Sequence, residues 1–239
     1  MSQESVFRIE LRGTRYFVHT DEYKHLTKVL RKSVGDEIIV IDGFGTGFLC
    51  KIEENTGEDS LSVSILETLP EYGEHNFHIV CFLGMLHKRD RLEWFVEKAV
   101  ELGSNHIILK ECKYSEKQNV SESRINKIMW SALKQSKRSR LPKLSILGVN
   151  ENWSWSDGLD LKLIATCASN QKRLPVSQVL QGTIQSIGLA IGPEGDFSER
   201  EIEDAIDSGF VSVSLGVNRL RSESAALYML STVKLYLGY

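Results

Sequence analysis

The stretch SIGLAIGPEGDFSEREIEDAIDSGF, residues 186–210, contains the transition on which the fold prediction depends. Residues 186–191 form a short apolar run, which is typical of a parallel strand covered on both faces. Ser198 and Glu201 lie three residues apart in the pattern of a capping box, so a helix is predicted over 198–208. A strand, a glycine-rich turn and a capped helix in this order predict one unit of an α/β domain.

The same alternation of apolar runs and helical periods continues on both sides of this stretch. Further strands are expected at residues 79–84, 106–109, 144–149, 161–166 and 211–215, and further helices at 90–102, at 121–137 and from Ser222, its expected N-cap, onward. Because the strands alternate with helices, the pattern predicts a parallel sheet.

The first part of the chain has a different period. Residues 7–18 and 37–69 alternate apolar and polar side chains as strands do, and residues 25–36 are predicted to form one short helix. The segment DGFGTGF, residues 42–48, has strands on both sides, which favours a hairpin over a phosphate-binding loop. A small β-barrel domain over residues 1–72, followed by an α/β domain over 73–239, is therefore expected.

Composition excludes several protein classes. Hydrophobic residues make up 41% of the chain, and no apolar run approaches the roughly 20 residues that span a bilayer. The N-terminus lacks the basic and then apolar order of a signal peptide, so a cytoplasmic location is expected. The four cysteines and six histidines show neither C-x-x-C nor H-x-x-x-H spacing, so no metal site is predicted.

Positive charge is concentrated in one stretch. Residues 110–143 carry ten basic and three acidic side chains, whereas the segments on either side have net negative charge. Near its end lie Lys134, Lys137, Arg138 and Arg140. Such a cluster is the pattern expected of a contact with a phosphate backbone, and a solvated helix face is the alternative.

Two loops near the C-terminus carry the strongest signals for a binding site. In IGPEGDFS, residues 191–198, two glycines allow a backbone to approach a ligand closely, and Glu194 lies at the tip. In LGVNRLRSESAA, residues 215–226, Arg219, Arg221 and Glu223 crowd the start of an apolar helix. Ligands bind beyond the carboxyl ends of parallel strands, and the two strands that these loops follow are expected to be adjacent. Neither loop matches a dinucleotide or nucleoside triphosphate motif, and a plain turn is the alternative for each.

Together the two loops resemble the signature of the ribosomal RNA small subunit methyltransferase E family, the 16S rRNA (uracil-N3)-methyltransferases of the SPOUT superfamily. The resemblance extends to RYFV (15–18), HLTKVLR (25–31), KRDRLEWFVEKAVELG (88–103) and ALKQSKRSRLP (132–142). It implies a PUA-like RNA-binding barrel, a SPOUT α/β domain with a C-terminal trefoil knot, S-adenosylmethionine as cofactor, 16S rRNA or the small subunit as substrate, and a homodimer.

The resemblance also implies site residues. The cofactor-binding residues would be Ala165, Thr166, Cys167, Gly192, Pro193, Glu194, Gly195, Leu215, Gly216, Asn218, Leu220 and Arg221. From the chemistry of the reaction we hypothesise that Arg221, or Arg138 of the partner subunit, stabilises the uracil anion. In the same hypothesis Glu223 orients Arg221 or relays a proton, and a charge favoured at a helix N-terminus is the alternative for Glu223. The RNA-binding residues would be Arg15, Arg31, Lys134, Lys137, Arg138 and Arg140.

Several positions depart from the family pattern. Asp196 replaces a glycine, Lys134 a glutamate, and Lys110 a proline. These changes keep two further hypotheses open, an RNA-binding or ribosome-assembly protein that has lost catalysis and a methyltransferase acting on small molecules.

Overall fold

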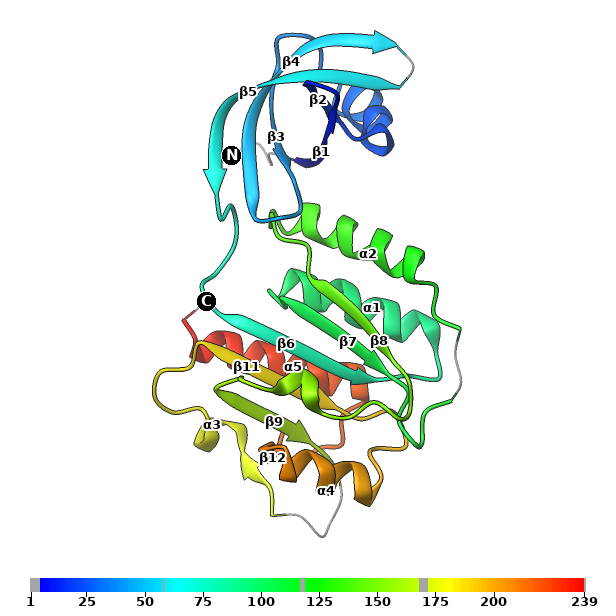
Figure 1. Cartoon of the computed structure of the whole chain (residues 1–239), viewed down its shortest axis with the longest axis vertical. Helices are drawn as coiled ribbons and strands as arrows, with labels where there is room; N and C mark the ends of the chain where they lie inside the picture. The colour runs from blue at the N-terminus through cyan, green and yellow to red at the C-terminus, as the bar shows by residue number, and fades with distance from the viewer. Residues whose placement is uncertain (1–4, 58, 117–118, 168–171, 239) are drawn as a thin grey trace. The chain divides into compact units, whose positions relative to one another are not determined.

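The computed structural model describes residues 5–57, 59–116, 119–167 and 172–238, and the chain divides into two compact units (Figure 1). Unit 1 consists of Met1–His75 together with Trp130–Leu141, and unit 2 consists of Asn76–Met129 together with Pro142–Tyr239. In the described part of the chain, no helix combines the length and the apolar character needed to cross a membrane.

Unit 1 contains a closed five-stranded barrel in the order β1-β2-β5-β4-β3. Its strands are β1 (Val6–Arg12), β2 (Arg15–Val18), β3 (Glu37–Ile41), β4 (Thr46–Gly57) and β5 (Ser60–Pro70). Alternate residues of the strands point inward, as the sequence pattern predicts, and Val40, Cys50 and Ile52 have no exposed surface. The glycine-rich segment 42–48 connects the antiparallel pair β3 and β4, which confirms the predicted hairpin.

The helix predicted over residues 25–36 is much shorter in the structure. Within the predicted range only η2 (His25–Val29), a π-helical turn that lies shortly after the 3₁₀ turn η1 (Thr20–Glu22), is helical. The chain leaves it through Arg31, which has a φ of 55°. Asp36 then accepts a hydrogen bond from the Ser33 backbone N–H, 2.8 Å away. Local turn chemistry therefore overrides the helical period of HLTKVLRKSVGD.

Residues 130–141 pack with the barrel although they lie far from it in sequence. The Leu141 backbone N–H donates to the Gly43 carbonyl at 2.9 Å, and the Gly45 N–H donates to the Ser139 carbonyl at 3.1 Å. A Cβ on Gly43 would lie 2.6 Å from the Trp130 ring, so glycine is needed there for the ring to fit.

Unit 2 is built on a parallel seven-stranded sheet in the order β10-β12-β9-β11-β6-β7-β8. Its strands are β6 (His78–Gly84), β7 (His106–Lys110), β8 (Lys143–Leu147), β9 (Leu161–Ala165), β10 (Leu174–Pro175), β11 (Ser186–Ile191) and β12 (Val211–Ser214). The predicted strands are confirmed within one or two residues. Sequence reasoning missed the two-residue strand β10 and the short helix α3 (Val176–Val179).

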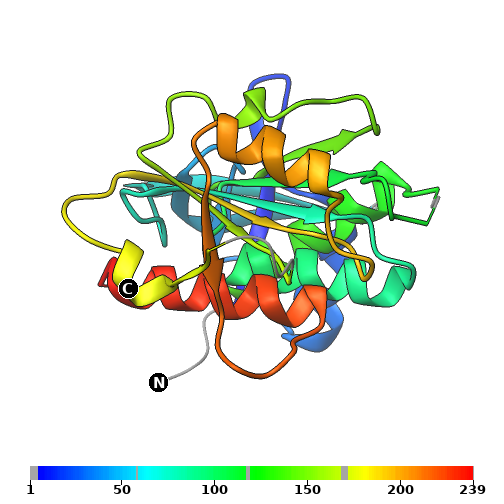
Figure 2. The same ribbon diagram turned by 90° about the horizontal axis from the view of Figure 1, so that it is seen from below.

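Helices cover both faces of this sheet (Figure 2). Helices α1 (Arg89–Glu101) and α5 (Ser222–Tyr236) lie on one face, and α4 (Glu199–Asp207) lies on the other. The capping box is confirmed, since the Ser198 hydroxyl accepts from the Glu201 N–H and the Glu201 carboxylate accepts from the Ser198 N–H. The remaining helices are α2 (Glu122–Gln135) and the 3₁₀ turn η3 (Ser154–Ser156).

Two sequence predictions about unit 2 are wrong. Ser222 does not cap α5; the N-cap residue is Arg221, which forms no side-chain capping bond. The strands that precede the two glycine-rich loops are not adjacent, because β9 pairs with β11 on one side and with β12 on the other. The trefoil knot stays a prediction.

Candidate functional site

A cavity of about 810 Å³ lies where β9, β11 and β12 of unit 2 end. Three groups of described residues line it: residues 165–167 and Arg173 after β9, residues 191–194 and Asp196 after β11, and residues 213–222 at and after the end of β12. The charged side chains of its lining are Arg173, Glu194, Asp196, Arg219 and Arg221. Because all three strands are parallel, their carboxyl ends bring these loops together at one edge of the sheet.

The cavity collects nearly all the residues that the sequence predicted for a cofactor site. Of those twelve residues, Gly195 alone is absent from its lining. Gly195 has a structural role instead, since a Cβ there would lie 2.8 Å from Cβ of Tyr114. The end of β9, expected as a third wall, lies between the other two walls because β9 separates β11 from β12.

Glu194 at the tip of the β11 loop contacts the loop that follows β6. Its carboxylate oxygens accept from the His87 backbone N–H at 3.1 and 3.2 Å. The Arg91 guanidinium lies 4.0 Å from the same carboxylate. Below it, a Cβ on Gly84 would lie 2.5 Å from Pro193, so glycine at the end of β6 allows the two loops to meet. These contacts hold the G-P-E-G turn at the cavity edge.

Asp196 joins two walls of the cavity. One carboxylate oxygen accepts from the Thr166 hydroxyl at 2.9 Å and from the Cys167 backbone N–H at 2.7 Å. The other accepts from the Phe197 N–H at 2.8 Å. Asp196 has a φ of 64°, a conformation in which glycine is favoured and Asp is tolerated. Asp196 therefore adopts a backbone conformation that glycine favours, and its carboxylate connects the end of β9 to the loop after β11.

Arg221 and Glu223 are close in sequence but lie in different surroundings in the structure. Arg221 is exposed and lines the cavity, and its guanidinium forms no ion pair with any described residue. Glu223 is buried, and one of its oxygens lies 3.6 Å from Nε of Arg91. Its other oxygen has no hydrogen-bond partner among the described residues. Glu223 therefore pairs with Arg91 of α1, and the interactions of the described residues include no hydrogen bond or ion pair between Glu223 and Arg221. The expected orienting role of Glu223 stays a prediction.

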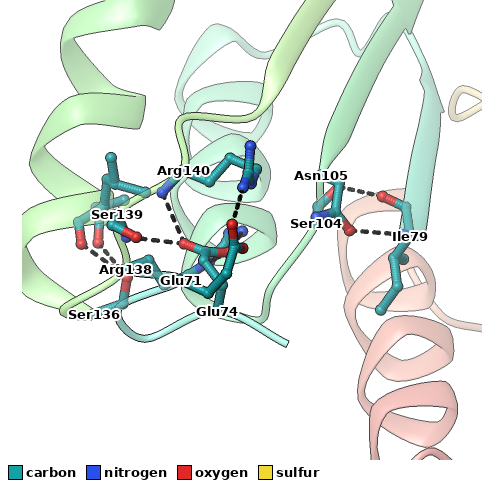
Figure 3. A network of polar contacts seen from close by, with 11 residues as sticks. Glu71, Glu74, Ile79, Ser104, Asn105, Ser136, Arg138, Ser139 and Arg140 are labelled. Carbon is teal, nitrogen blue, oxygen red and sulfur yellow. Dashed lines mark hydrogen bonds and ion pairs between the residues drawn. The ribbon is translucent and has the colours of Figure 1, made fainter. Parts of the chain in front are cut away.

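Arg138 forms a buried ion pair inside unit 1 (Figure 3). Its Nη2 lies 2.8 Å from the Glu74 carboxylate, and both side chains are almost fully buried, with 4% and 2% exposed. The second oxygen of Glu74 accepts from the backbone N–H groups of Ser139 and Arg140, each at 2.8 Å. Arg138, predicted to contact RNA and to act in catalysis, has its charge matched within the fold.

The other basic candidates differ in how far their charge is matched. Lys134 pairs with Glu22, and Arg140 pairs with Glu71 at 2.5 Å. The side chain of Lys137 is exposed, and among the described residues it has no ion pair. In the barrel, Arg15 and Arg31 are exposed, and Arg15 lies 3.8 Å from Glu54. The structure thus leaves Lys137 and Arg31 as the candidates without an acidic neighbour in the described chain.

Sequence reasoning missed Arg173 and the contribution of Asp196. Arg173 follows residues 168–171, which lie outside the described residues, and its guanidinium donates to the Thr166 carbonyl at 3.1 Å. No motif marked it. Asp196 was visible as a departure from the family glycine, but only the fold shows which donors it meets.

Lys110, the other departure near the sheet edge, is a buried structural group. Its ammonium donates to the carbonyls of Glu111, Gly148 and Val149 at 3.2, 3.1 and 2.9 Å. Three donors meet three acceptors, which satisfies the buried charge. Among the described residues, no group of three or more His, Cys, Asp or Glu side chains could hold a metal ion.

Comparisons with known proteins match both units. The family model of the RNA methyltransferase domain matches residues 73–234, and that of the RNA methyltransferase PUA domain matches residues 20–66. The ribosomal RNA small subunit methyltransferase E of Mesomycoplasma hyopneumoniae (strain 232) is 31% identical over 185 residues, 72% of this chain and 76% of that protein. That of Bacillus subtilis (strain 168) is 27% identical over 226 residues, 89% of this chain and 87% of that protein.

Solved structures agree with the sequence comparisons. A probable rRNA-methyltransferase from Porphyromonas gingivalis has a TM-score of 0.85 and 28% identity, covering 97% of this chain and 98% of that chain. A Legionella pneumophila methyltransferase, solved with the bound cofactor SAM, has a TM-score of 0.78 and 25% identity, covering 98% of each chain. With a domain model matched over most of its length, this chain belongs to the RNA methyltransferases of the ribosomal RNA small subunit methyltransferase E family.

Proposed function

We propose that this protein transfers a methyl group from S-adenosylmethionine to N3 of one uridine in 16S rRNA. The observation that carries the proposal is the cavity in unit 2, in which three loops from the carboxyl ends of parallel strands meet. Family membership supports the reaction class, and the cavity supplies a place for it in this chain.

The cavity lining suits the cofactor chemically. Apolar side chains such as Ile191, Val213 and Leu215 offer a surface for a flat purine ring, while the exposed backbone of the glycine-rich loops offers hydrogen-bond donors and acceptors. Its volume, about 810 Å³, lies within the range of ligand pockets. When bound, S-adenosylmethionine supplies a methyl group on a positively charged sulfur.

Arg221 has the charge and the exposure needed to stabilise the uridine that accepts the methyl group. Uridine N3 becomes a nucleophile only after it loses its proton, so a nearby fixed positive charge lowers the cost of forming the anion. Arg221 lines the cavity, is exposed, and has no carboxylate partner in the described chain. We assign it to the developing negative charge on N3 and O4.

Glu223 and Arg138 take smaller parts in this proposal. The buried Glu223 carboxylate lies in the first turn of α5, where the helix dipole favours a negative charge, and it pairs with Arg91. Arg138 is left out of the catalytic group because its guanidinium is buried against Glu74. Lys137, Arg15 and Arg31 are the proposed phosphate contacts, since their side chains are exposed.

We also propose that the protein is a cytoplasmic homodimer. Helices α1 and α5 lie on one face of the unit 2 sheet and present large exposed side chains. Trp94 is 45% exposed, Tyr228 53% and Leu235 78%. Large exposed apolar side chains on these two helices favour association with a second copy. Sedimentation analysis tests the homodimer, and a monomer at micromolar concentration would contradict it.

Incubation of the protein with cofactor and either free 16S rRNA or small subunits tests the reaction. The rRNA should come from cells in which the corresponding gene is deleted, and nuclease digestion with mass spectrometry locates the product. We expect one uridine to gain a methyl group at N3. Methylation at another atom or on another RNA would contradict the N3 assignment.

Calorimetry separates the competing functions. No heat on titration with S-adenosylmethionine at millimolar concentration would support an RNA-binding or assembly protein that has lost catalysis. Methyl transfer to nucleosides at the same rate as to rRNA would support an enzyme acting on small molecules. We expect the wild-type protein to bind the cofactor and to require rRNA as acceptor.

A further inference from the structure

The lining of the unit 2 cavity carries a net positive charge, which is unfavourable for binding a positively charged sulfonium. The charged side chains in its lining are three arginines, Arg173, Arg219 and Arg221, and two carboxylates, Glu194 and Asp196. An excess of positive charge suits an RNA acceptor, but it repels a cofactor whose sulfur is positively charged. A negative group that is not already paired would offset that repulsion.

The two carboxylates differ in this respect. Glu194 accepts from the His87 N–H and lies 4.0 Å from Arg91, so part of its charge is matched by a cation. Asp196 forms no ion pair with any described residue. Its three hydrogen-bond donors, from Thr166, Cys167 and Phe197, are all neutral groups. These bonds hold the carboxylate in place without cancelling its net charge.

We propose that Asp196 makes the cavity prefer the positively charged methyl donor over the neutral thioether that remains after transfer. In the reaction the sulfur–methyl bond breaks, its electron pair stays on sulfur, and the methyl group joins N3 of the base, whose proton goes to solvent. The ligand thereby loses one positive charge. A fixed negative charge in the wall favours the ligand before this step and not after it, which promotes release of the product.

The inference rests on the proposed function, because it concerns the ligand of that reaction. It adds a role for the Asp196 carboxylate in distinguishing the two ligands. The position takes a positive φ of 64°, which glycine adopts without strain, so the backbone alone does not call for an aspartate. The proposed role therefore belongs to the carboxylate and not to the backbone conformation.

Calorimetric titration with S-adenosylmethionine and S-adenosylhomocysteine provides the test. The measured quantity is the ratio of their two dissociation constants for wild type, Asp196→Asn and Asp196→Glu in low salt. For charges some 7–10 Å apart at an effective dielectric of about 20, removing the negative charge should weaken donor binding about tenfold or more. Product binding should change by less than about threefold, so the preference for the donor falls in Asp196→Asn and is retained in Asp196→Glu.

Asp160→Asn is the matched control. Asp160 lies at the opposite end of the same sheet, just before β9, and accepts from the backbone N–H groups of Gln185 and Ser186 at 2.9 and 2.8 Å. These hydrogen bonds hold the pKa of its carboxyl below the ordinary value. It thus joins β9 to the start of β11 as Asp196 joins β9 to the loop after β11. Its variant should leave the ratio unchanged.

The outcomes separate the two proposals. Equal weakening of both ligands in Asp196→Asn would mean that Asp196 only positions the loops, and would overturn the inference. If the Asp196 variants do not fold, as judged by circular dichroism, the two dissociation constants of the wild-type protein provide the test. Tighter binding of the neutral product than of the donor would overturn the inference. A wild-type protein that binds neither ligand would instead overturn the proposed function.

Discussion

Two regions rich in arginine use the same charge in different ways. In residues 130–141 of unit 1, Arg138 and Arg140 face the carboxylates of Glu74 and Glu71. In the cavity of unit 2, Arg221 meets no carboxylate in the described chain. Both regions are basic in sequence, but the first contributes to packing and the second is free to meet a ligand. A basic run therefore predicts a binding surface only when the fold has not already matched its charges.

The largest expected effect comes from breaking the buried pair in unit 1. Glu74→Ala removes the carboxylate that accepts from Arg138 and from two backbone N–H groups, so the buried guanidinium loses this matching negative charge. Stability should fall by about 3–5 kcal/mol. Urea unfolding, followed by circular dichroism, measures the change.

Glu71→Ala is the control for that substitution. Glu71 and Arg140 form an ion pair whose side chains are 60% and 41% exposed, so its loss should cost less than about 1 kcal/mol. Similar unfolding midpoints for the two variants would show that the pair of Glu74 with Arg138 does not organise the segment.

Removing the free arginine should affect the reaction instead of stability. Arg221→Ala should lower the single-turnover methylation rate by about 100-fold to 1000-fold, because it withdraws a positive charge from the developing anion. Cofactor affinity should change by less than about threefold. Rapid-quench kinetics and calorimetry give the two quantities.

Arg219→Ala sharpens the assignment of Arg221. Both arginines line the cavity, so both variants remove one positive charge from its wall. If Arg221 contacts the acceptor base, its loss slows the reaction far more than the loss of Arg219. Equal losses of rate and of cofactor affinity in Arg221→Ala would reject the catalytic role.

The smallest effect is expected at an exposed lysine of the basic segment. Lys137→Gln should weaken rRNA binding and reduce the slope of log affinity against log salt by nearly one, as the loss of a single phosphate contact does. Arg140→Gln should reduce it less, since Glu71 already neutralises part of that charge. Filter binding between about 50 and 200 mM salt measures both slopes. An unchanged slope in Lys137→Gln would identify the segment as a solvated face.

Much of the fold could be predicted because its signals are local. The capping box of Ser198 and Glu201 and the apolar run of residues 186–191 depend on neighbours in sequence, and both were confirmed. Predictions about the ends of elements were weaker. A helix was predicted over residues 25–36, but only a five-residue turn is present, and Ser222 is not the N-cap of α5.

The position of the cavity was largely indicated by the sequence as well. Glycine-rich turns and a resemblance to family motifs mark the loops after β11 and β12, and the cavity lies there. The position of β9 between these strands was not predicted, because strand order depends on long-range pairing. The matching of Arg138 in the basic segment could not be predicted for a similar reason, since Glu74 lies 64 residues before it in the chain.

The sequence by itself determined the class of fold, the two glycine-rich loops and the family, because each depends on patterns among residues that are close together in the chain. Only the tertiary structure decided which charges are free and which are matched. It buried Arg138 against Glu74, paired Glu223 with Arg91, and set Asp196 among neutral donors at the cavity wall. Electrostatic energy depends on distance in space and on exposure to water, and neither is a property of position along the chain.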